Sequence, residues 1–158
     1  METLEVGCAI IHKHGKLLIA QRYLKDSFGG LWEFPGGKRE PEETIEACLA
    51  REAFEELGIR IHPERLLCHK VQGTSERKIS LCFFFCRWVS GEPQAIDCKD
   101  FRWVSREDIR QYTLLPGDLE VLEDLALHWD EYFIQTSPSP PLARSRPSAE
   151  KGGDEGEE

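Results

Sequence analysis

Apolar residues in the first part of the chain form short segments separated by turn residues. Two of these segments, residues 3–12 (TLEVGCAIIH) and 16–22 (KLLIAQR), are joined through Lys-His-Gly, which predicts a β-hairpin. A shorter apolar segment at residues 31–34 (LWEF) runs into Pro-Gly-Gly, which predicts a turn. A hairpin and a turn are therefore expected before the first helix.

The second part of the chain shows further strands and then helical spacing. Residues 60–73 and 78–91 are predicted strands, and the second is too apolar for an exposed sheet edge. Residues 101–105 (FRWVS) predict another strand, and residues 106–112 (REDIRQY) a short helix. Apolar residues at helical spacing over residues 117–133 predict a closing amphipathic helix.

The composition changes from about Thr136. Residues 136–158 are rich in Ser, Pro, Gly and charge and offer little to bury, so they are expected to be disordered. The preceding residues, 1–135, are long enough for one domain with a real core. Strands interspersed with helices predict an α/β architecture, with helices packed on a mixed β-sheet.

The overall charge excludes one class of partner. The chain carries a formal net charge of −9, whereas a protein that binds a nucleic-acid polymer needs a basic surface. No apolar run approaches the ~18 residues of a membrane span, and the N-terminus lacks the long apolar stretch of a signal peptide. We therefore expect a cytoplasmic protein without nucleic-acid or membrane partners. The oligomeric state stays open.

The six cysteines do not indicate a disulfide or zinc framework. They form no CxxC pair and no Cys/His cluster at zinc spacing. Cys82 and Cys86 share one face of an apolar strand, where small buried thiols are common. The cysteines are therefore interpreted as core residues, and none of the five scattered histidines is assigned to a metal.

A helix with defined ends is predicted in the middle of the chain. Thr44 is a good N-cap, residues 45–57 form the body, and Gly58 is a good C-terminal stop. At 100° per residue, Glu52, Glu55 and Glu56 fall on one arc. The residues expected on the opposite arc, facing the core, are Ala47, Ala50, Ala53, Phe54 and Leu57.

Two readings of the three glutamates are open from spacing alone. Like charges at this spacing destabilise a helix unless a counter-charge holds them. One reading is a solvated acidic face, as most charge runs are. The other is a site for a hard divalent cation such as Mg²⁺, which takes oxygen ligands from carboxylates, water and substrate phosphate.

The segment around these acids resembles a known family signature. Gly37 is followed after five residues by Glu43 and, after seven more, by REAFEELGI, residues 51–59. This arrangement is similar at every fixed position to the Nudix hydrolase signature, Gx5Ex7REUxEExGU with U apolar. The segments AIIHKHGKLLIAQR, GLWEFPGGK and FRWVS stand in the order expected of the MutT branch. The resemblance covers residues 3 to about 134 and implies the Nudix fold, an α/β/α sandwich with a mixed β-sheet.

The resemblance implies a metal-binding site with a general base. Glu55 and Glu56 match the principal metal ligands, and Glu52 matches both a metal ligand and the general base. The backbone carbonyl of Gly36 or Gly37 is expected to complete this set. The implied cofactor is Mg²⁺, with Mn²⁺ as the alternative.

Further positions carry roles by the same resemblance. Arg51 and Glu43 are expected to form an orienting pair in the catalytic site. Lys38 stands where a cation meets the phosphates, or else it is a solvated surface lysine. A loop acid before the FRWVS strand is expected to join the metal site. The candidates in that loop, with Asp97 favoured over the other two, are Asp97, Asp100 and Glu92.

Two residues are candidates for substrate recognition. Arg22 stands where the MutT type places a substrate-contacting arginine; otherwise it is a strand-end charge. Asp118 aligns with the residue that reads the base edge in purine-binding relatives. On local grounds Asp118 is also a good N-cap, because Pro-Gly-Asp precedes the closing helix. Both roles of Asp118, base reading and helix capping, stay open, and they can coexist.

The activity implied is metal-dependent hydrolysis of nucleoside triphosphates to the monophosphate and pyrophosphate. Oxidised purines such as 8-oxo-dGTP are the leading substrates, with sanitation of the nucleotide pool and DNA repair as the implied role. One alternative is a pyrophosphohydrolase for CTP or dCTP, which shares nearly all these motifs. Another is a catalytically silent module that binds nucleotides or a protein. The intact acid set, residues 43 to 56, argues against that module.

Overall fold

The computed structural model describes residues 2–134, so the tail predicted at residues 136–158 lies outside the described residues. The chain divides into two compact units, Met1–Leu122 and Glu123–Glu158. The elements, in order, are β1 (Glu2–Lys13), β2 (Lys16–Gln21), β3 (Trp32–Glu33), β4 (Gly36–Lys38), α1 (Ile45–Leu57), β5 (Arg60–Gly73), β6 (Arg77–Ser90), β7 (Asp100–Ser105), a 3₁₀ turn (Ile109–Gln111), α2 (Pro116–Leu127) and a π-helical turn (Asp130–Ile134).

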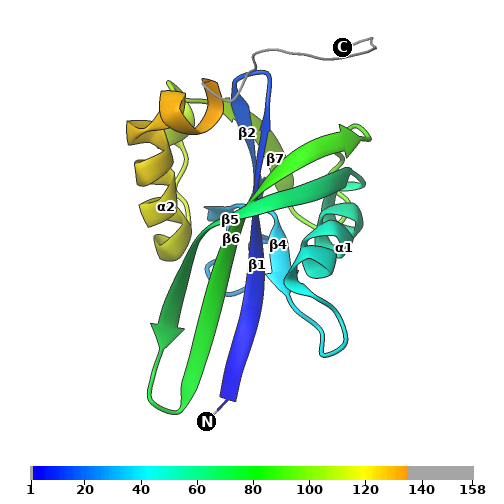
Figure 1. The fold of residues 1–158 in the computed structure, drawn as a ribbon, viewed down its shortest axis with the longest axis vertical. Coiled ribbons are helices and arrows are strands. Elements are labelled where there is room, and N and C mark those ends of the chain that lie inside the picture. The colour runs from blue at the N-terminus through cyan, green and yellow to red at the C-terminus, as the bar shows by residue number, and fades with distance from the viewer. Residues whose placement is uncertain (1, 135–158) are drawn as a thin grey trace. The chain divides into compact units, whose positions relative to one another are not determined.

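The first unit contains one mixed sheet of seven strands. Its main path runs β3-β2-β1-β6-β5, with β4 paired to β1 and β7 paired to β2. β1 and β6 are parallel, and the other pairs are antiparallel. Figure 1 shows β1, β5 and β6 side by side as the longest strands. The predicted mixed sheet is confirmed, and so is the internal position of the apolar strand β6.

Helix α1 begins and ends where the sequence predicts. The Thr44 hydroxyl oxygen accepts a hydrogen bond from the Ala47 amide at 3.0 Å, which satisfies one of the orphan donors of the first turn. At the other end Gly58 adopts a φ of 71° and its N–H donates to the Phe54 carbonyl. Glycine takes this left-handed conformation at no steric cost, so the helix stops there.

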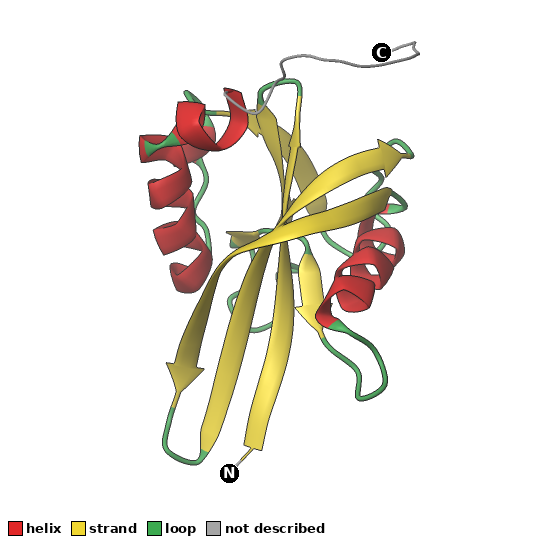
Figure 2. Ribbon diagram, in the orientation of Figure 1, coloured by secondary structure: helices red, strands yellow, loops and turns green. Residues whose placement is uncertain are grey.

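One buried cluster of the core lies between α1 and the sheet, and Figure 2 shows this helix beside the strands. A Cβ atom at Gly7 of β1 would come within 2.8 Å of the Leu49 side chain, so the glycine allows α1 to approach the sheet closely. Full burial of a leucine such as Leu49 contributes about 1.5–3 kcal/mol. The residues of this cluster are Ala9, Ile11, Leu18, Ala20, Leu49, Ala53, Leu57, Ile59, Ile61, Phe84, Cys86 and Cys98.

Three local predictions are wrong. Gly36 and Gly37 lie in β4, paired with β1, rather than in a turn, because glycine lets this backbone lie directly against Gly7. The helix predicted over residues 106–112 is a single 3₁₀ turn. The closing helix starts at Pro116, a favourable first helical residue, and the regular α-helix ends at Leu127 instead of continuing to residue 133.

None of the six cysteines forms a disulfide, and four are buried: Cys8, Cys48, Cys86 and Cys98. Cys68 and Cys82 are half-buried. The core interpretation therefore holds for four thiols and in part for two. Within the described residues, no helix has the length and apolar character that crossing a bilayer requires.

Candidate active site

Of the three clustered glutamates of α1, Glu52 and Glu56 lie in its buried stripe, whereas Glu55 is exposed. The side chains that α1 buries are Cys48, Leu49, Ala53 and Leu57. Glu52 and Glu56 fall at i+3 and i+4 steps within this stripe and are themselves half-buried. Ala47 and Phe54, predicted to face the core, are exposed instead, Phe54 by 48%. The two glutamates therefore occupy the positions that an ordinary amphipathic helix gives to apolar residues.

Burial governs the protonation of these two acids. Burial, followed by the charges of Glu52 and Glu33, raises the pKa of Glu56 to about 9. The pKa of Glu52 is also raised, and burial is again the largest cause. The Gly36 amide donates to Glu56 Oε1 at 3.4 Å, which partly offsets the effect. Such a cluster stabilises a cation placed among its oxygens.

The two glycines of β4 are required by different neighbours. A Cβ atom at Gly37 would overlap the carboxyl group of Glu52, and one at Gly36 would overlap the backbone carbonyl of Gly7. Gly37 therefore leaves room for a carboxylate, whereas Gly36 leaves room for the neighbouring strand. The Cys48 thiol donates to the Gly37 carbonyl at 3.4 Å, so that carbonyl already has a partner on α1.

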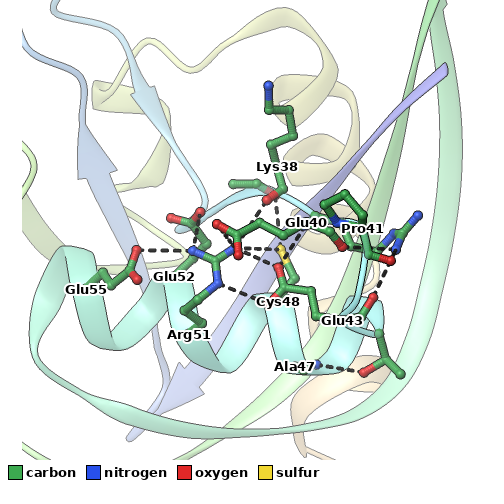
Figure 3. Close-up of polar contacts among 12 residues, drawn as sticks. Lys38, Glu40, Pro41, Glu43, Ala47, Cys48, Arg51, Glu52 and Glu55 are labelled. Atoms are coloured by element: carbon green, nitrogen blue, oxygen red, sulfur yellow. Dashed lines mark hydrogen bonds and ion pairs between the residues drawn. The ribbon is translucent and has the colours of Figure 1, made fainter. Parts of the chain in front are cut away.

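Arg51 connects Glu52 of the buried stripe to Glu43 and Glu55, which lie outside it, as Figure 3 shows. Its guanidinium donates to Glu43 through Nε at 3.0 Å and Nη2 at 2.7 Å. Its Nη1 donates to Glu52 Oε2 at 3.2 Å and to Glu55 Oε1 at 3.1 Å. Hydrogen bonds from Arg51 and the Glu40 amide hold the pKa of Glu43 at about 2. The predicted pairing of Arg51 with Glu43 is present, and Arg51 also neutralises two of the three helix acids.

A cavity of about 510 Å³ opens beside this cluster. Glu33, Glu52 and Glu56 form an acidic part of its wall, and Lys38 and Arg22 supply two cations. The remaining wall is largely apolar and includes Val6, Phe34, Ile79, Leu81 and Leu115. The volume is within the range of small-molecule sites in proteins.

Asp118 lies in the wall of the same cavity and is only 5% exposed. Its Oδ2 accepts a hydrogen bond from the Phe34 amide at 2.8 Å. Because α2 begins at Pro116, Asp118 lies inside the first turn, and its carboxyl group binds Phe34 rather than capping α2. The N-cap prediction is therefore wrong. Burial raises the pKa of Asp118 to about 7, against the lowering effect of the Phe34 hydrogen bond.

Glu33 is a site residue that the sequence reasoning missed. It lines the cavity and accepts from Arg22 Nη1 at 3.3 Å. Burial raises its pKa more than Arg22 lowers it. A signal was present: Glu33 is the one charged residue in the apolar segment LWEF, immediately before Phe-Pro-Gly-Gly. Arg22 is thus held by a site acid rather than standing as a free strand-end charge.

A second cavity, of about 330 Å³, shares Arg22, Glu33 and Glu56 with the first. Asp97 lines it, and the Asp97 amide donates to the Glu56 carbonyl at 3.0 Å. Asp100 instead accepts from the Phe101 amide at 2.8 Å and pairs with Arg102 at 2.7 Å. The third candidate, Glu92, is exposed. Of the three loop acids, Asp97 is the one in a cavity wall with a helix acid.

The chemistry of these donors fits a hard divalent cation. Carboxylate and carbonyl oxygens are the ligands that such ions take. Over residues 2–134 in this conformation, no three Asp, Glu, His or Cys side chains are grouped around one point. Arg51 supplies the counter-charge of Glu52 and Glu55 instead. These donors fit such a cation in kind, and Arg51 would have to release Glu52 and Glu55 for the cation to bind them.

Comparison with known proteins agrees with the fold. Residues 1–125 match the NUDIX domain. The chain is 39% identical over 123 residues to the CTP pyrophosphohydrolase of Escherichia coli (strain K12), over 78% of this chain and 91% of that protein. It is 48% identical over 84 residues to the 8-oxo-dGTP diphosphatase of Proteus vulgaris, over 52% of this chain and 75% of that protein.

A solved structure extends the comparison. The solution structure of the E. coli ORF135 protein superimposes with a TM-score of 0.71 at 36% identity, over 83% of this chain and 94% of that chain. The predicted Nudix fold is thereby confirmed. The family match, the relatives and the mixed sheet lead to the same assignment: this chain belongs to the NUDIX domain family and is a Nudix hydrolase of nucleotide-derived substrates.

Proposed function

We propose that the protein hydrolyses nucleoside triphosphates to the nucleoside monophosphate and pyrophosphate. The observation that carries this proposal is the single cavity that joins Glu52 and Glu56 to Asp118. A binding site for a nucleoside triphosphate needs one end that neutralises the charge of the phosphates. Its other end should be largely apolar, with a polar group that anchors the base. The cavity provides both within one space. The names of the relatives, a pyrophosphohydrolase and a diphosphatase, support the same reaction.

Nudix hydrolases in general use divalent metals, and we propose Mg²⁺ as the cofactor, with Mn²⁺ able to replace it. Glu52, Glu55, Glu56 and Asp97 would hold it. The Gly36 carbonyl is a better additional ligand than that of Gly37, which the Cys48 thiol engages. When bound, the metal neutralises phosphate oxygens and lowers the pKa of water.

Side chains of the protein supply the general base and the groups that bind the phosphates. Glu52 is the proposed general base, because it is half-buried beside Glu56 and its pKa is raised towards the working pH. Arg51, fixed by Glu43, holds Glu52 through its 3.2 Å hydrogen bond until the cation takes its place. Arg22 and Lys38 line the cavity as cations that bind the phosphate chain.

Asp118 is the proposed base-reading residue. Its Oδ2 is occupied by the Phe34 amide, and no described residue donates a hydrogen bond to Oδ1. With a pKa of about 7, the carboxyl group is available in both protonation states near neutral pH. A carboxyl group in a largely apolar part of the cavity wall discriminates strongly between nucleobases. A base whose edge lacks the matching hydrogen-bonding group leaves the carboxyl group unpaired.

Two nucleobase classes are candidates for this pocket. Oxidised purine triphosphates such as 8-oxo-dGTP come first and are supported by the 48% identical Proteus relative. Cytidine-type triphosphates come second and are supported by the E. coli relative, whose match extends over 91% of that protein. A role in sanitising the nucleotide pool follows from the first class.

A panel assay tests the proposal. The purified protein is incubated with Mg²⁺ and 8-oxo-dGTP, dGTP, CTP or dCTP, and products are identified by ³¹P NMR. Equal amounts of monophosphate and pyrophosphate, abolished by EDTA and by Glu56→Gln, are expected. Glu46→Gln on the exposed side of α1 is the matched control and retains turnover. Tight nucleotide binding without pyrophosphate release would instead establish a silent binding module.

A further inference from the structure

The loop that connects β2 to β3 is closed by its own hydrogen bonds. The Arg22 amide donates to the Leu31 carbonyl at 2.9 Å, and the Gly30 amide donates to the Arg22 carbonyl at 3.1 Å. The Arg22 side chain adds a bond from Nε to the Ser27 carbonyl at 2.9 Å. The same guanidinium contacts Glu33, so the loop is tied directly to the site.

Phe28 has an unfavourable backbone and an unfavourable environment within this loop. Its φ is +56°, a conformation that a bulky side chain rarely adopts. Its ring is 64% exposed, although an aromatic ring gains free energy by leaving water. Gly29 and Gly30 follow immediately, so glycines stand beside the strained position rather than at it. Such an outlier is a reason to look for function.

The location of Phe28 explains both features. It lines the 510 Å³ cavity whose wall also holds Asp118 and Lys38. Leu24, in the same loop and 70% exposed, does not line that cavity. Within residues 2–134 the Phe28 ring contacts no other aromatic ring in a stacked or edge-on pair. Its face is therefore available to a planar ligand.

We propose that Phe28 is the stacking platform for the nucleobase, and that the loop is held in its strained conformation to present the ring at the cavity. The inference rests on the proposed function, because it takes a nucleotide as the ligand. The ring supplies a face for any base, while Asp118 reads the base edge. Phe28 thus contributes affinity that is tolerant of base identity. The bound base in turn covers apolar surface that water contacts in the free protein.

The predicted effect is on binding rather than on chemistry. Loss of a base–aromatic stack corresponds to a rise of about 5- to 150-fold in KM. Phe28→Ala is expected to raise KM within this range, with kcat changed less than about twofold, because the phenyl ring has no group that transfers a proton. Phe28→Tyr retains a ring and is expected to restore KM. Leu24→Ala removes an equally exposed apolar side chain from the same loop and is expected to leave both constants unchanged.

Inhibition by the two products distinguishes a loss of base stacking from general damage to the active site. Phe28→Ala should weaken inhibition by the nucleoside monophosphate and leave inhibition by pyrophosphate, which has no base, unchanged. Phe28→Gly should weaken nucleotide binding equally while melting at or above the wild-type temperature, because glycine adopts positive φ without cost.

Each outcome has a defined meaning. An unchanged KM in Phe28→Ala, or equal weakening of both products, overturns the stacking proposal. Melting of Phe28→Gly below Phe28→Ala overturns the strain argument. A wild-type protein that releases no pyrophosphate from any triphosphate refutes the proposed function instead. In that case, Phe28 is tested by the quenching of a fluorescent nucleotide that the protein binds.

Discussion

Arg51 and Glu43 form a bidentate pair, with two guanidinium nitrogens on two carboxylate oxygens at 3.0 and 2.7 Å. The pair lets Arg51 keep one nitrogen, Nη1, for Glu52 and Glu55. Glu43 is thus the fixed support, and the helix acids are the exchangeable partners. This division predicts that an added cation competes with Arg51 for Glu52 and Glu55 but not for Glu43.

Arg51→Lys is expected to lower the melting temperature in metal-free buffer and to reduce kcat about tenfold or more. Lysine has no planar fork, so it cannot hold Glu43 and still reach Glu52. Mg²⁺ should restore part of the melting temperature, because it replaces the missing counter-charge. Arg87→Lys, in an exposed pair with Glu64 at 3.3 Å, is the control and should change stability by under about 0.5 kcal/mol. Equal behaviour of the two variants in calorimetry and turnover would contradict this role.

Stability without metal should fall as the pH rises. The pKa of Glu56 is about 9 in the folded protein against an ordinary value of 4.5, so the folded state holds the proton more tightly. Its contribution to stability is full below about pH 4.5 and is lost as the pH rises towards 9. Mg²⁺ should recover stability increasingly over this range and release protons on binding.

Glu56→Gln tests this assignment, since the amide cannot ionise. The variant should melt above the wild type at pH 8.5 in EDTA and lose at least about 10²-fold in kcat. Differential scanning calorimetry in EDTA and in Mg²⁺, from pH 5 to 9, provides the comparison. Identical pH profiles for wild type and variant would refute the assignment.

Alanine substitutions at the two adjacent glycines, Gly36 and Gly37, should have different effects. Gly36→Ala puts a methyl group into the backbone of Gly7 and should therefore destabilise the β1–β4 pairing. Gly37→Ala meets the end of a side chain, Glu52, which can move. We expect a large drop in melting temperature for the first, and a smaller drop with a large loss of kcat for the second. Thermal melts beside turnover measurements check this contrast; a reversed order would refute it.

Sequence reasoning was accurate where local rules decide the structure. Thr44 and Gly58 define the ends of α1 through their own capping chemistry, and β5 has the predicted bounds because its pattern is continuous. Sequence reasoning failed where the structure depends on contacts between segments that are far apart in the sequence. Asp118 lies inside the first turn of α2 and accepts a hydrogen bond from the Phe34 amide, 84 residues away in the sequence. The predicted core face of α1, which included Ala47 and Phe54, left Glu52 and Glu56 outside, because their inward orientation depends on the room that the glycine strand leaves.

Asp118→Asn should stabilise the protein at alkaline pH. The pKa of Asp118 is about 7 in the folded protein and about 3.8 ordinarily, so its ionisation reduces stability as the pH rises from about 4 to 7. Asparagine still accepts from the Phe34 amide but carries no charge. The variant should nearly match the wild type at pH 4 and exceed it by about 4 kcal/mol at pH 8. Urea titrations at pH 4 and pH 8 give the difference in unfolding free energy between variant and wild type. An equal difference at the two pH values would contradict the prediction.

Asp118→Ala should change substrate preference. If the carboxyl reads the base edge, kcat/KM should fall far more for the preferred triphosphate than for the others. Measurements with 8-oxo-dGTP, dGTP and dCTP in wild type and variant give the ratios. Ratios that stay constant while stability drops would leave Asp118 with only the structural bond to Phe34.

The inward stripe of α1 has a consequence for protein engineering. Positions 52 and 56 lie among Leu49, Ala53 and Leu57 and hold half-buried glutamates. A library of α1 variants selected only for survival on heating would favour apolar side chains at both positions, since these bury surface without desolvating a charge. If Glu52 and Glu56 have the roles proposed above, the most heat-resistant clones would be catalytically dead. Thermostabilisation of this protein would then have to hold positions 52 and 56 constant from the start.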